Sequence, residues 1–194
     1  KSDLRRGKPT LHKIYGLELA INAGDALMTV MWKMIINQGD TKIIDEFYKI
    51  MMRTVLGQGV ELIWAEKNRK NIPDTEYFFS ADSKSGYYSI AGPMRLGALL
   101  ASASKSELNK ITNFGLHLGR CFQLVDDLID YDQDKKEGKT TLANTKGIDY
   151  VKKLATKEKN MAREIFDKKL DFLKKEPARS QLKELIAFIL ERKY

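Results

Sequence analysis

Apolar residues recur every three to four positions along almost the whole chain, which is the spacing of amphipathic α-helices. No segment shows the alternation of apolar and polar residues that is typical of a half-buried strand. The pattern predicts a series of long helices. Their expected ranges are residues 10–37, 42–69, 75–102, 106–131, 149–175 and 178–192. The predicted fold is therefore an all-α bundle.

Short polar segments separate these helices and supply the expected caps. Thr41 is the expected N-cap of the second helix, and Ser106 is that of the fourth. Pro93 is expected to kink the third helix because proline lacks a backbone N–H group. Residues 75–78 are expected to form a turn, and residues 132–148, rich in Lys, Gly and Thr, a mobile loop.

The fourth predicted helix is apolar nearly all round but carries one acidic face. With about 100° per residue, one apolar stripe forms its expected core seam. The stripe consists of Ile111, Phe114, Leu118, Phe122, Val125 and Ile129. Gln123, Asp126 and Asp130 share another face, with Asp127 at its margin. Because a helix of this kind is buried, the acidic face is expected to line an internal cavity.

Neighbouring carboxylates in such a place repel each other. Two like charges about 4 Å apart cost on the order of 4 kcal/mol at an effective dielectric constant near 20. The C-terminal end of a helix also disfavours anions. Bound Mg²⁺ would offset this cost, since proteins usually hold it through one or two carboxylates plus substrate phosphates. The alternative is a solvated acidic helix end, which is the favoured interpretation for Asp132 and Asp134.

Several basic residues beside small residues are candidate phosphate ligands. Arg5 and Arg6 come just before a Pro-Thr helix start, and guanidinium groups bind phosphate through paired hydrogen bonds. Lys84 lies in DSKSGYY and Lys139 in KEGKTT. The alternative for each is an ordinary basic residue on a loop or surface.

Two further patterns bear on the chemistry. Gln58 and Glu61 share a helix face in GQGVELIW, where the alternative is a close helix crossing at Gly57 and Gly59 with the polar pair outside. The two histidines form no recognisable dyad with Ser, Cys or Asp. An enzyme of this sequence should therefore need little general acid–base machinery.

Composition and charge narrow the class of protein. A length of 194 residues, 43% of them hydrophobic, suits one domain with a sizeable core. The single cysteine, Cys121, excludes a disulfide framework, indicates a reducing compartment and is expected to be buried. No apolar run approaches the roughly 20 residues that span a bilayer.

The net charge of +8 arises entirely in residues 135–194, which contain 17 Lys or Arg and 9 Asp or Glu. The favoured interpretation is the solvated face of Lys-rich helices. A basic surface can also contact nucleic acid, a membrane or an anionic substrate. No aromatic-basic stripe or helix-turn-helix pattern supports a nucleic-acid-binding protein.

Six segments in order along the chain resemble the trans-prenyl diphosphate synthases (polyprenyl synthetases, including farnesyl and geranylgeranyl diphosphate synthases). They are LRRGKPT at 4–10, NAGDAL at 22–27, GQGVELIW at 57–64, KSG at 84–86, FQLVDDLID at 122–130 and EGKTT at 137–141. The aspartate-rich segment is the most specific of them. The resemblance implies an isoprenoid-synthase-type helical bundle around a central cavity. It also implies that residues 1–194 form the C-terminal two-thirds of a single polyprenyl synthetase domain.

The same resemblance implies a Mg²⁺-dependent prenyltransferase of isoprenoid biosynthesis. Such an enzyme joins isopentenyl diphosphate to an allylic diphosphate and yields a short-chain trans-prenyl diphosphate, such as geranylgeranyl or farnesyl diphosphate. The implied metal-site residues are Asp126, Asp127, Asp130 and Glu61. The implied substrate-binding residues are Arg5, Arg6, Gln58, Lys84, Ser85, Gln123 and Lys139. Lys84, Gln123 and Asp126 are the implied catalytic residues.

Departures from the family pattern flank the implied metal site. The family's other aspartate-rich segment is expected just before Lys1, so the fold is expected to be incomplete at its N-terminus. The loop after Asp130 is shorter than the family pattern and lacks a Gly-Lys pair. We expect a cytoplasmic homodimer with no nucleic-acid partner and with a peripheral membrane contact for product release. The alternative is a non-catalytic subunit of a two-component prenyl synthase, against which the intact DDLID argues.

Overall fold

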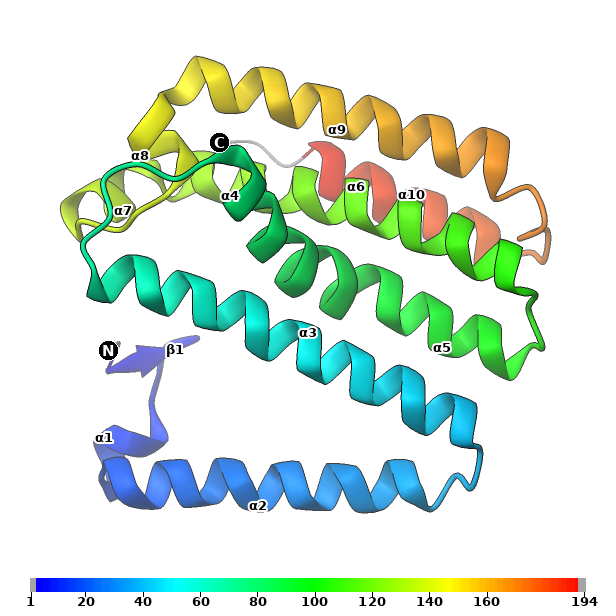
Figure 1. Cartoon of the computed structure of the whole chain (residues 1–194), viewed down its shortest axis with the longest axis horizontal. Coiled ribbons are helices and arrows are strands. Elements are labelled where there is room, and N and C mark those ends of the chain that lie inside the picture. The colour runs from blue at the N-terminus through cyan, green and yellow to red at the C-terminus, as the bar shows by residue number, and fades with distance from the viewer. Residues whose placement is uncertain (1–2, 192–194) are drawn as a thin grey trace. The chain divides into compact units, whose positions relative to one another are not determined.

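The computed structural model describes residues 3–191, in a chain that divides into two compact units, Lys1–Ile44 and Asp45–Tyr194 (Figure 1). The first unit contains β1 (Leu4–Arg5), β2 (Lys8–Pro9), α1 (Leu11–Tyr15) and α2 (Leu17–Ile36). Helix α3 (Thr41–Glu66) begins at the end of that unit. The second unit continues with α4 (Asp74–Ala81), the π-helix η1 (Asp82–Ala91), α5 (Gly92–Leu100), α6 (Lys105–Ile129), α7 (Tyr131–Lys136), α8 (Leu142–Lys146), α9 (Ile148–Lys169) and α10 (Ala178–Glu191). The predicted all-α class is confirmed, whereas the single domain stays a prediction.

The first unit differs from the single helix predicted over residues 10–37. Gly16 adopts φ +89° and ψ 162°, a conformation that is essentially restricted to glycine, and it therefore separates α1 from α2. Strands β1 and β2 form an antiparallel hairpin, with Arg6 and Gly7 at positive φ in its turn. Strands of two residues are too short to produce a period-two pattern, which explains why the hairpin was not predicted.

Helix α2 has the length and composition of a helix that could cross a membrane. It has 20 residues and contains an 18-residue stretch of mean hydropathy 1.3. The expectation that no segment qualifies was wrong because it required an uninterrupted apolar run. The average hydropathy stays high across Asn22, Asp25 and Lys33. Core helices of soluble proteins share this length and composition, so the finding assigns no membrane to the chain.

The predicted N-caps lie one or two residues away from the observed ones. Asp40, not Thr41, caps α3, since its Oδ1 accepts a backbone N–H from the first turn at 2.8 Å. Ser104, not Ser106, caps α6: its Oγ accepts the Glu107 N–H at 3.3 Å, and the Glu107 carboxylate accepts the Ser104 N–H at 2.7 Å. Only Ser104 has a glutamate three residues later, and this reciprocal pair forms a capping box.

The third predicted helix is a run of three helical segments, α4, η1 and α5. Helix α4 begins at Asp74, as the predicted helix start near Thr75 requires, and residues 75–78 belong to this helix instead of forming a separate entry turn. The predicted kink at Pro93 is replaced by π-helical residues 82–91, and Pro93 itself lies in the first turn of α5. There its missing N–H group costs little. π-helical segments frequently accompany functional sites, and this one contains Lys84 and Ser85.

The loop predicted over residues 132–148 contains the short helices α7 and α8. Asp132 is exposed as expected, but Asp134 is buried and lies 2.7 Å from Lys139 Nζ. Thr141 caps α8 by accepting the Asn144 N–H at 3.2 Å. Local polar contacts of this kind leave no hydrophobic period, so the pattern of apolar residues could not reveal these helices. The end predicted for the last helix, residue 192, lies outside the described residues.

Helix α6 forms the centre of the core of the second unit, where it packs against η1 and α9 (Figure 1). The buried residues of its predicted seam are Ile111, Phe114, Leu118 and Val125. Phe122 packs at the edge of the core, and Ile129 is 39% exposed because the helix ends there. Cys121 is buried as predicted, and burial raises the pKa of its thiol to about 11.

A buried ion pair joins α3 to η1 and α5. Arg95 donates from Nε and Nη2 to the two carboxylate oxygens of Glu46 at 2.6 and 2.7 Å, and the Tyr87 hydroxyl donates to Glu46 at 2.7 Å. Arg95 Nη1 also donates to the Leu108 carbonyl and the Thr112 hydroxyl, which lie on α6. Burial by itself would raise the pKa of Glu46, but the hydrogen bonds from Arg95 and Tyr87 outweigh it and lower the pKa.

We expect Glu46→Gln to reduce the free energy of unfolding by about 3 kcal/mol near neutral pH, because Arg95 then lacks its buried counter-charge. Since the folded-state pKa of Glu46 is lowered, ionised Glu46 stabilises the fold above the usual glutamate value of 4.5. That stabilisation is lost as the pH falls through the lowered pKa. The free energies of unfolding of the wild type and of Glu46→Gln, measured by urea titration, should therefore converge as the pH falls. The matched control is Glu66→Gln, at an exposed position of the same helix; a pH-independent deficit would contradict the assignment.

Candidate active site

One cavity in the second unit brings together most of the predicted site residues. Its volume is about 690 Å³, and it lies between the second half of α3, the start of η1, the end of α6 and residues 137–141. The predicted residues that line it are Gln58, Glu61, Lys84, Gln123, Asp126, Asp127, Asp130 and Lys139. The acidic face of α6 therefore lines a cavity, as its apolar surroundings predicted.

Glycines let the helices around this cavity approach closely. A Cβ on Gly119 of α6 would lie 2.2 Å from the Gly86 Cα of η1, and a Cβ on Gly57 of α3 would lie 2.5 Å from the Ser83 Cβ. The close crossing at Gly57, considered above as an alternative to a site, is thus present together with the cavity-lining polar pair. A methyl group added to Gly59, in contrast, would have no neighbouring atom within 4 Å.

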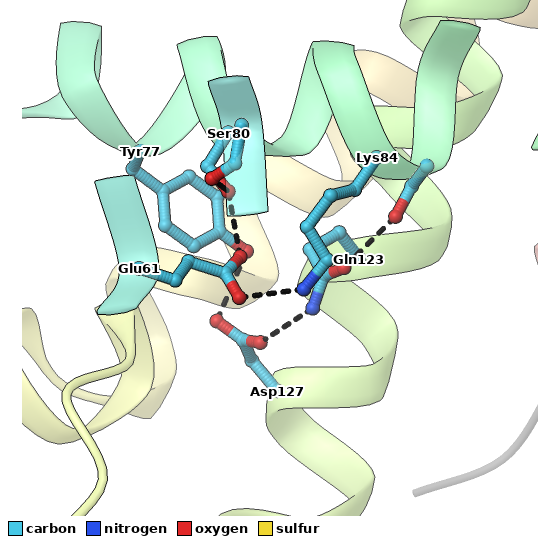
Figure 2. Close-up of polar contacts among 8 residues, drawn as sticks. Glu61, Tyr77, Ser80, Lys84, Gln123 and Asp127 are labelled. Carbon is cyan, nitrogen blue, oxygen red and sulfur yellow. Dashed lines mark hydrogen bonds and ion pairs between the residues drawn. The ribbon is translucent and has the colours of Figure 1, made fainter. Parts of the chain in front are cut away.

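Lys84 lies in the cavity wall with its charge balanced by Glu61. Lys84 Nζ is 2.5 Å from Glu61 Oε2, and the Ser80 hydroxyl donates to Glu61 Oε1 at 2.6 Å (Figure 2). An ammonium group has three donor hydrogens. One contact with Glu61 therefore leaves Lys84 able to donate to an anion in the cavity as well.

Gln123 and Asp127 form a chain of hydrogen bonds from η1 to the end of α6. Ser85 Oγ donates to Gln123 Oε1 at 2.9 Å, and Gln123 Nε2 donates to Asp127 Oδ1 at 3.1 Å. The Tyr77 hydroxyl donates to Asp127 Oδ2 at 2.9 Å (Figure 2). Burial raises the pKa of Asp127 to about 7, although the hydrogen bonds from Gln123 and Tyr77 act in the opposite direction. Both ends of the Gln123 amide and both oxygens of Asp127 are thus engaged by protein groups.

Tyr77 was not among the predicted site residues. It is buried, and burial followed by the neighbouring charge of Asp127 raises the pKa of its hydroxyl well above the usual value. A signal for it existed in the sequence. Tyr77 precedes Lys84 by seven residues, so two helical turns place both side chains on similar faces. A phenol hydroxyl within an apolar stripe needs a polar partner when it is buried.

Asp126 and Asp130 supply further carboxylates to the cavity, one partly buried and one exposed at the end of α6. Within residues 3–191, no three His, Cys, Asp or Glu side chains converge into a set that could hold a metal ion. Mg²⁺ does not require such a set, because it commonly takes one or two carboxylates and completes its shell with water and phosphate oxygens. The hard oxygen donors of Asp126 and Asp130 fit that mode of binding.

Lys139 reaches the cavity from the segment between α7 and α8. Its Nζ lies 2.7 Å from Asp134 Oδ1 and 3.0 Å from Glu137 Oε2, and hydrogen bonds to these carboxylates raise its pKa. The next residue, Thr140, donates from Oγ1 to the Arg69 carbonyl at 2.9 Å, which attaches this segment to the connection after α3. Lys139 is therefore a cation at the rim of the cavity.

The other two predicted phosphate ligands belong to the first unit. Arg5 lies in β1, and Arg6 is in the hairpin turn with φ +52°. Their roles in substrate binding stay predictions.

A sequence profile described as Polyprenyl synthetase matches residues 1–187, nearly the whole chain. The chain belongs to the polyprenyl synthetase family. A geranylgeranyl diphosphate synthase of Sulfolobus acidocaldarius is 31% identical over 144 residues, which cover 71% of this chain and 43% of that protein. A farnesyl diphosphate synthase of Geobacillus stearothermophilus is 32% identical over 148 residues, covering 71% of this chain and 48% of that protein. This polyprenyl synthetase chain thus spans about half the length of the curated relatives that it matches.

Solved structures confirm the isoprenoid-synthase type of helical fold for this polyprenyl synthetase. A polyprenyl synthase from Caulobacter crescentus, solved with calcium and isoprenyl diphosphate, superposes with a TM-score of 0.83 at 21% identity and covers all of this chain and 72% of its own. A geranylgeranyl pyrophosphate synthetase from the archaeon Geoglobus acetivorans gives a TM-score of 0.79 at 23% identity, covering 93% of this chain and 69% of its own. At these identities the likeness concerns the fold alone.

We expect Gly119→Ala to destabilise the protein by about 1–3 kcal/mol, because the new methyl group would overlap the backbone of η1. Gly97→Ala on α5 is the matched control: nothing lies within 4 Å of its added methyl group, and it should be neutral or stabilising. Thermal unfolding of all three proteins measures the effect. Equal melting temperatures of Gly119→Ala and Gly97→Ala would contradict the close contact between α6 and η1.

Proposed function

We propose that the whole protein is a Mg²⁺-dependent prenyltransferase that condenses isopentenyl diphosphate with an allylic diphosphate. The observation that carries this proposal is the composition of the cavity. Carboxylates of α6 line one part of it, and the cations Lys84 and Lys139 line other parts. A magnesium diphosphate needs both, because the metal binds carboxylate oxygens while the phosphate oxygens bind cations.

The proposed roles follow from the position of each side chain. Asp126 and Asp130 would hold Mg²⁺ on the allylic diphosphate, and Glu61 would face the metal-bound water. Lys84 would donate to the diphosphate from the wall of the cavity, and Lys139 would do so from its rim. Arg5 and Arg6 remain proposed ligands of the two diphosphates, on the strength of the resemblance of LRRGKPT alone.

The proposed reaction is electrophilic. The C–O bond of the allylic substrate breaks, and both bonding electrons leave with the diphosphate. The double bond of isopentenyl diphosphate attacks the resulting cation, and a proton is then lost to the departed diphosphate. Bound Mg²⁺ supplies Lewis-acid stabilisation of the leaving group. Lys84 and Lys139 stabilise the same developing charge by preorganised electrostatics, which requires no histidine or serine nucleophile.

The relatives named above support a short-chain product of the geranylgeranyl or farnesyl class. GQGVELIW is more similar to geranylgeranyl-type members, and we propose that class first. We further propose a cytoplasmic homodimer that makes a peripheral membrane contact when it releases its product. These properties concern the whole protein.

An assay with labelled isopentenyl diphosphate tests the proposal. The whole protein is incubated with an allylic diphosphate and Mg²⁺, and the chain length of the product is read by chromatography. We expect a prenyl diphosphate of the geranylgeranyl class and no product when Mg²⁺ is chelated. Absence of any prenyl product with every allylic substrate would favour a non-catalytic subunit instead.

We expect Asp126→Ala to lower turnover by about two orders of magnitude or more while the fold persists, since the cavity loses a metal-binding carboxylate. Asp132→Ala is the control, because Asp132 is exposed on α7 and does not line the cavity. Circular dichroism checks the fold, and steady-state kinetics measure turnover. Equal turnover in the two variants would remove the acidic face of α6 from the mechanism.

A further inference from the structure

The carboxylate of Asp127 is tied into the protein through both of its oxygens. Tyr77 of α4 donates to one oxygen at 2.9 Å, and Gln123 of α6 donates to the other at 3.1 Å. The backbone N–H of Leu142, the first residue of α8, also acts on this carboxylate and lowers its pKa. One side chain of α6 thus interacts with α4 and with the start of α8.

These contacts separate Asp127 from its two neighbours on the acidic face. Asp127 is only 5% exposed, whereas Asp126 is partly buried and Asp130 is exposed. A carboxylate can accept about four hydrogen bonds, and the donors from Tyr77 and Gln123 use part of that capacity, one on each oxygen. A metal ion at Asp127 would compete with these buried donors, and a displaced donor would lack a partner at a cost of about 1–3 kcal/mol.

The interaction with Leu142 connects Asp127 to the Lys139 segment. Leu142 is fully buried in the core and directly follows Thr141, and the Asn144 side chain donates from Nδ2 to the Lys139 carbonyl at 3.0 Å. The N-terminus of α8 is therefore the fixed end of the segment that brings Lys139 to the cavity. A displaced Asp127 would remove one of the contacts that hold that end, beside the burial of Leu142 and the Thr141 cap.

We propose that Tyr77 is a positioning residue that holds Asp127 as a brace between α4, α6 and α8. The brace leaves Asp126 and Asp130 as the metal-binding carboxylates and keeps Lys139 at the rim of the cavity. This inference rests on the proposed function only because that function assigns the cavity to a magnesium diphosphate. It removes Asp127 from the predicted metal ligands and gives a role to a residue that the sequence motifs did not include.

Two tyrosines allow a matched comparison. Tyr77→Phe and Tyr87→Phe each remove one buried hydroxyl that donates to a buried carboxylate, but Tyr87 donates to Glu46 away from the cavity. Both variants should lower the melting temperature to a similar degree. Only Tyr77→Phe should weaken the binding of inorganic diphosphate with Mg²⁺, by about tenfold, because loss of the brace would disturb the end of α6 that carries Asp126 and Asp130, and groups that support metal ligands typically contribute 10- to 100-fold to affinity or activity. Calorimetry with the whole protein measures this difference.

A double-mutant cycle distinguishes a brace from a ligand. If Tyr77 acts through Asp127, the losses in diphosphate affinity caused by Tyr77→Phe and Asp127→Asn should not add in the double variant. Each loss should also be smaller than that of Asp126→Asn. Hydrogen exchange at the Leu142 amide should become faster in Tyr77→Phe and Asp127→Asn and remain unchanged in Tyr87→Phe.

Three results would overturn the proposal: equal diphosphate affinity in the two tyrosine variants, a loss for Asp127→Asn as large as that for Asp126→Asn, or unchanged exchange at Leu142. Failure of the proposed function has a different signature. In that case the wild-type protein forms no prenyl product, while the exchange rate at Leu142 still reports whether Tyr77 holds the brace.

Discussion

The cavity depends on the contact between the backbones of α6 and η1. Gly119 and Gly86 meet so closely that a methyl group on Gly119 would overlap the opposite chain. This contact sets the distance between two helices that carry different kinds of polar side chain. Ser85 of η1 can hydrogen-bond to Gln123 of α6 only because no side chain separates the helices one turn earlier. The position of Lys84 relative to the acidic face follows from the same contact.

The two lysines at the cavity are each paired with carboxylates of the protein. Glu61 balances Lys84, and Asp134 and Glu137 balance Lys139. Each cation is therefore held at a defined place by a carboxylate of its own wall. Such preorganisation reduces the rearrangement needed when a charged ligand enters, which is the main source of electrostatic catalysis in enclosed sites. The second unit thus brings paired lysines and the carboxylates of α6 to one cavity from segments that are far apart in the chain.

Periodic features of the sequence predicted the fold well, whereas features that do not repeat along the chain were not predicted. The core seam of α6 and the cavity-facing position of Asp126 follow from helical spacing, which the folded chain preserves. The break at Gly16 depends on a single backbone conformation, and α8 begins at a cap made by Thr141. Neither feature repeats along the chain. Site residues were found through motifs, and Tyr77 belongs to none of them. Its spacing from Lys84 indicates the face of the helix, but its contact with Asp127, 50 positions away, could not be predicted from local sequence.

A neutral donor at position 77 suits the acidic face better than a basic side chain would. Burial raises the pKa of Asp127 and so favours its neutral form, and the hydrogen bonds from Tyr77 and Gln123 oppose that tendency. A lysine there would also stabilise the carboxylate, but its positive charge would cancel part of the negative potential that attracts a divalent cation. Tyrosine and glutamine satisfy the buried oxygens without adding charge. The geometry of Asp127 is thereby fixed while the attraction of α6 for a cation is retained.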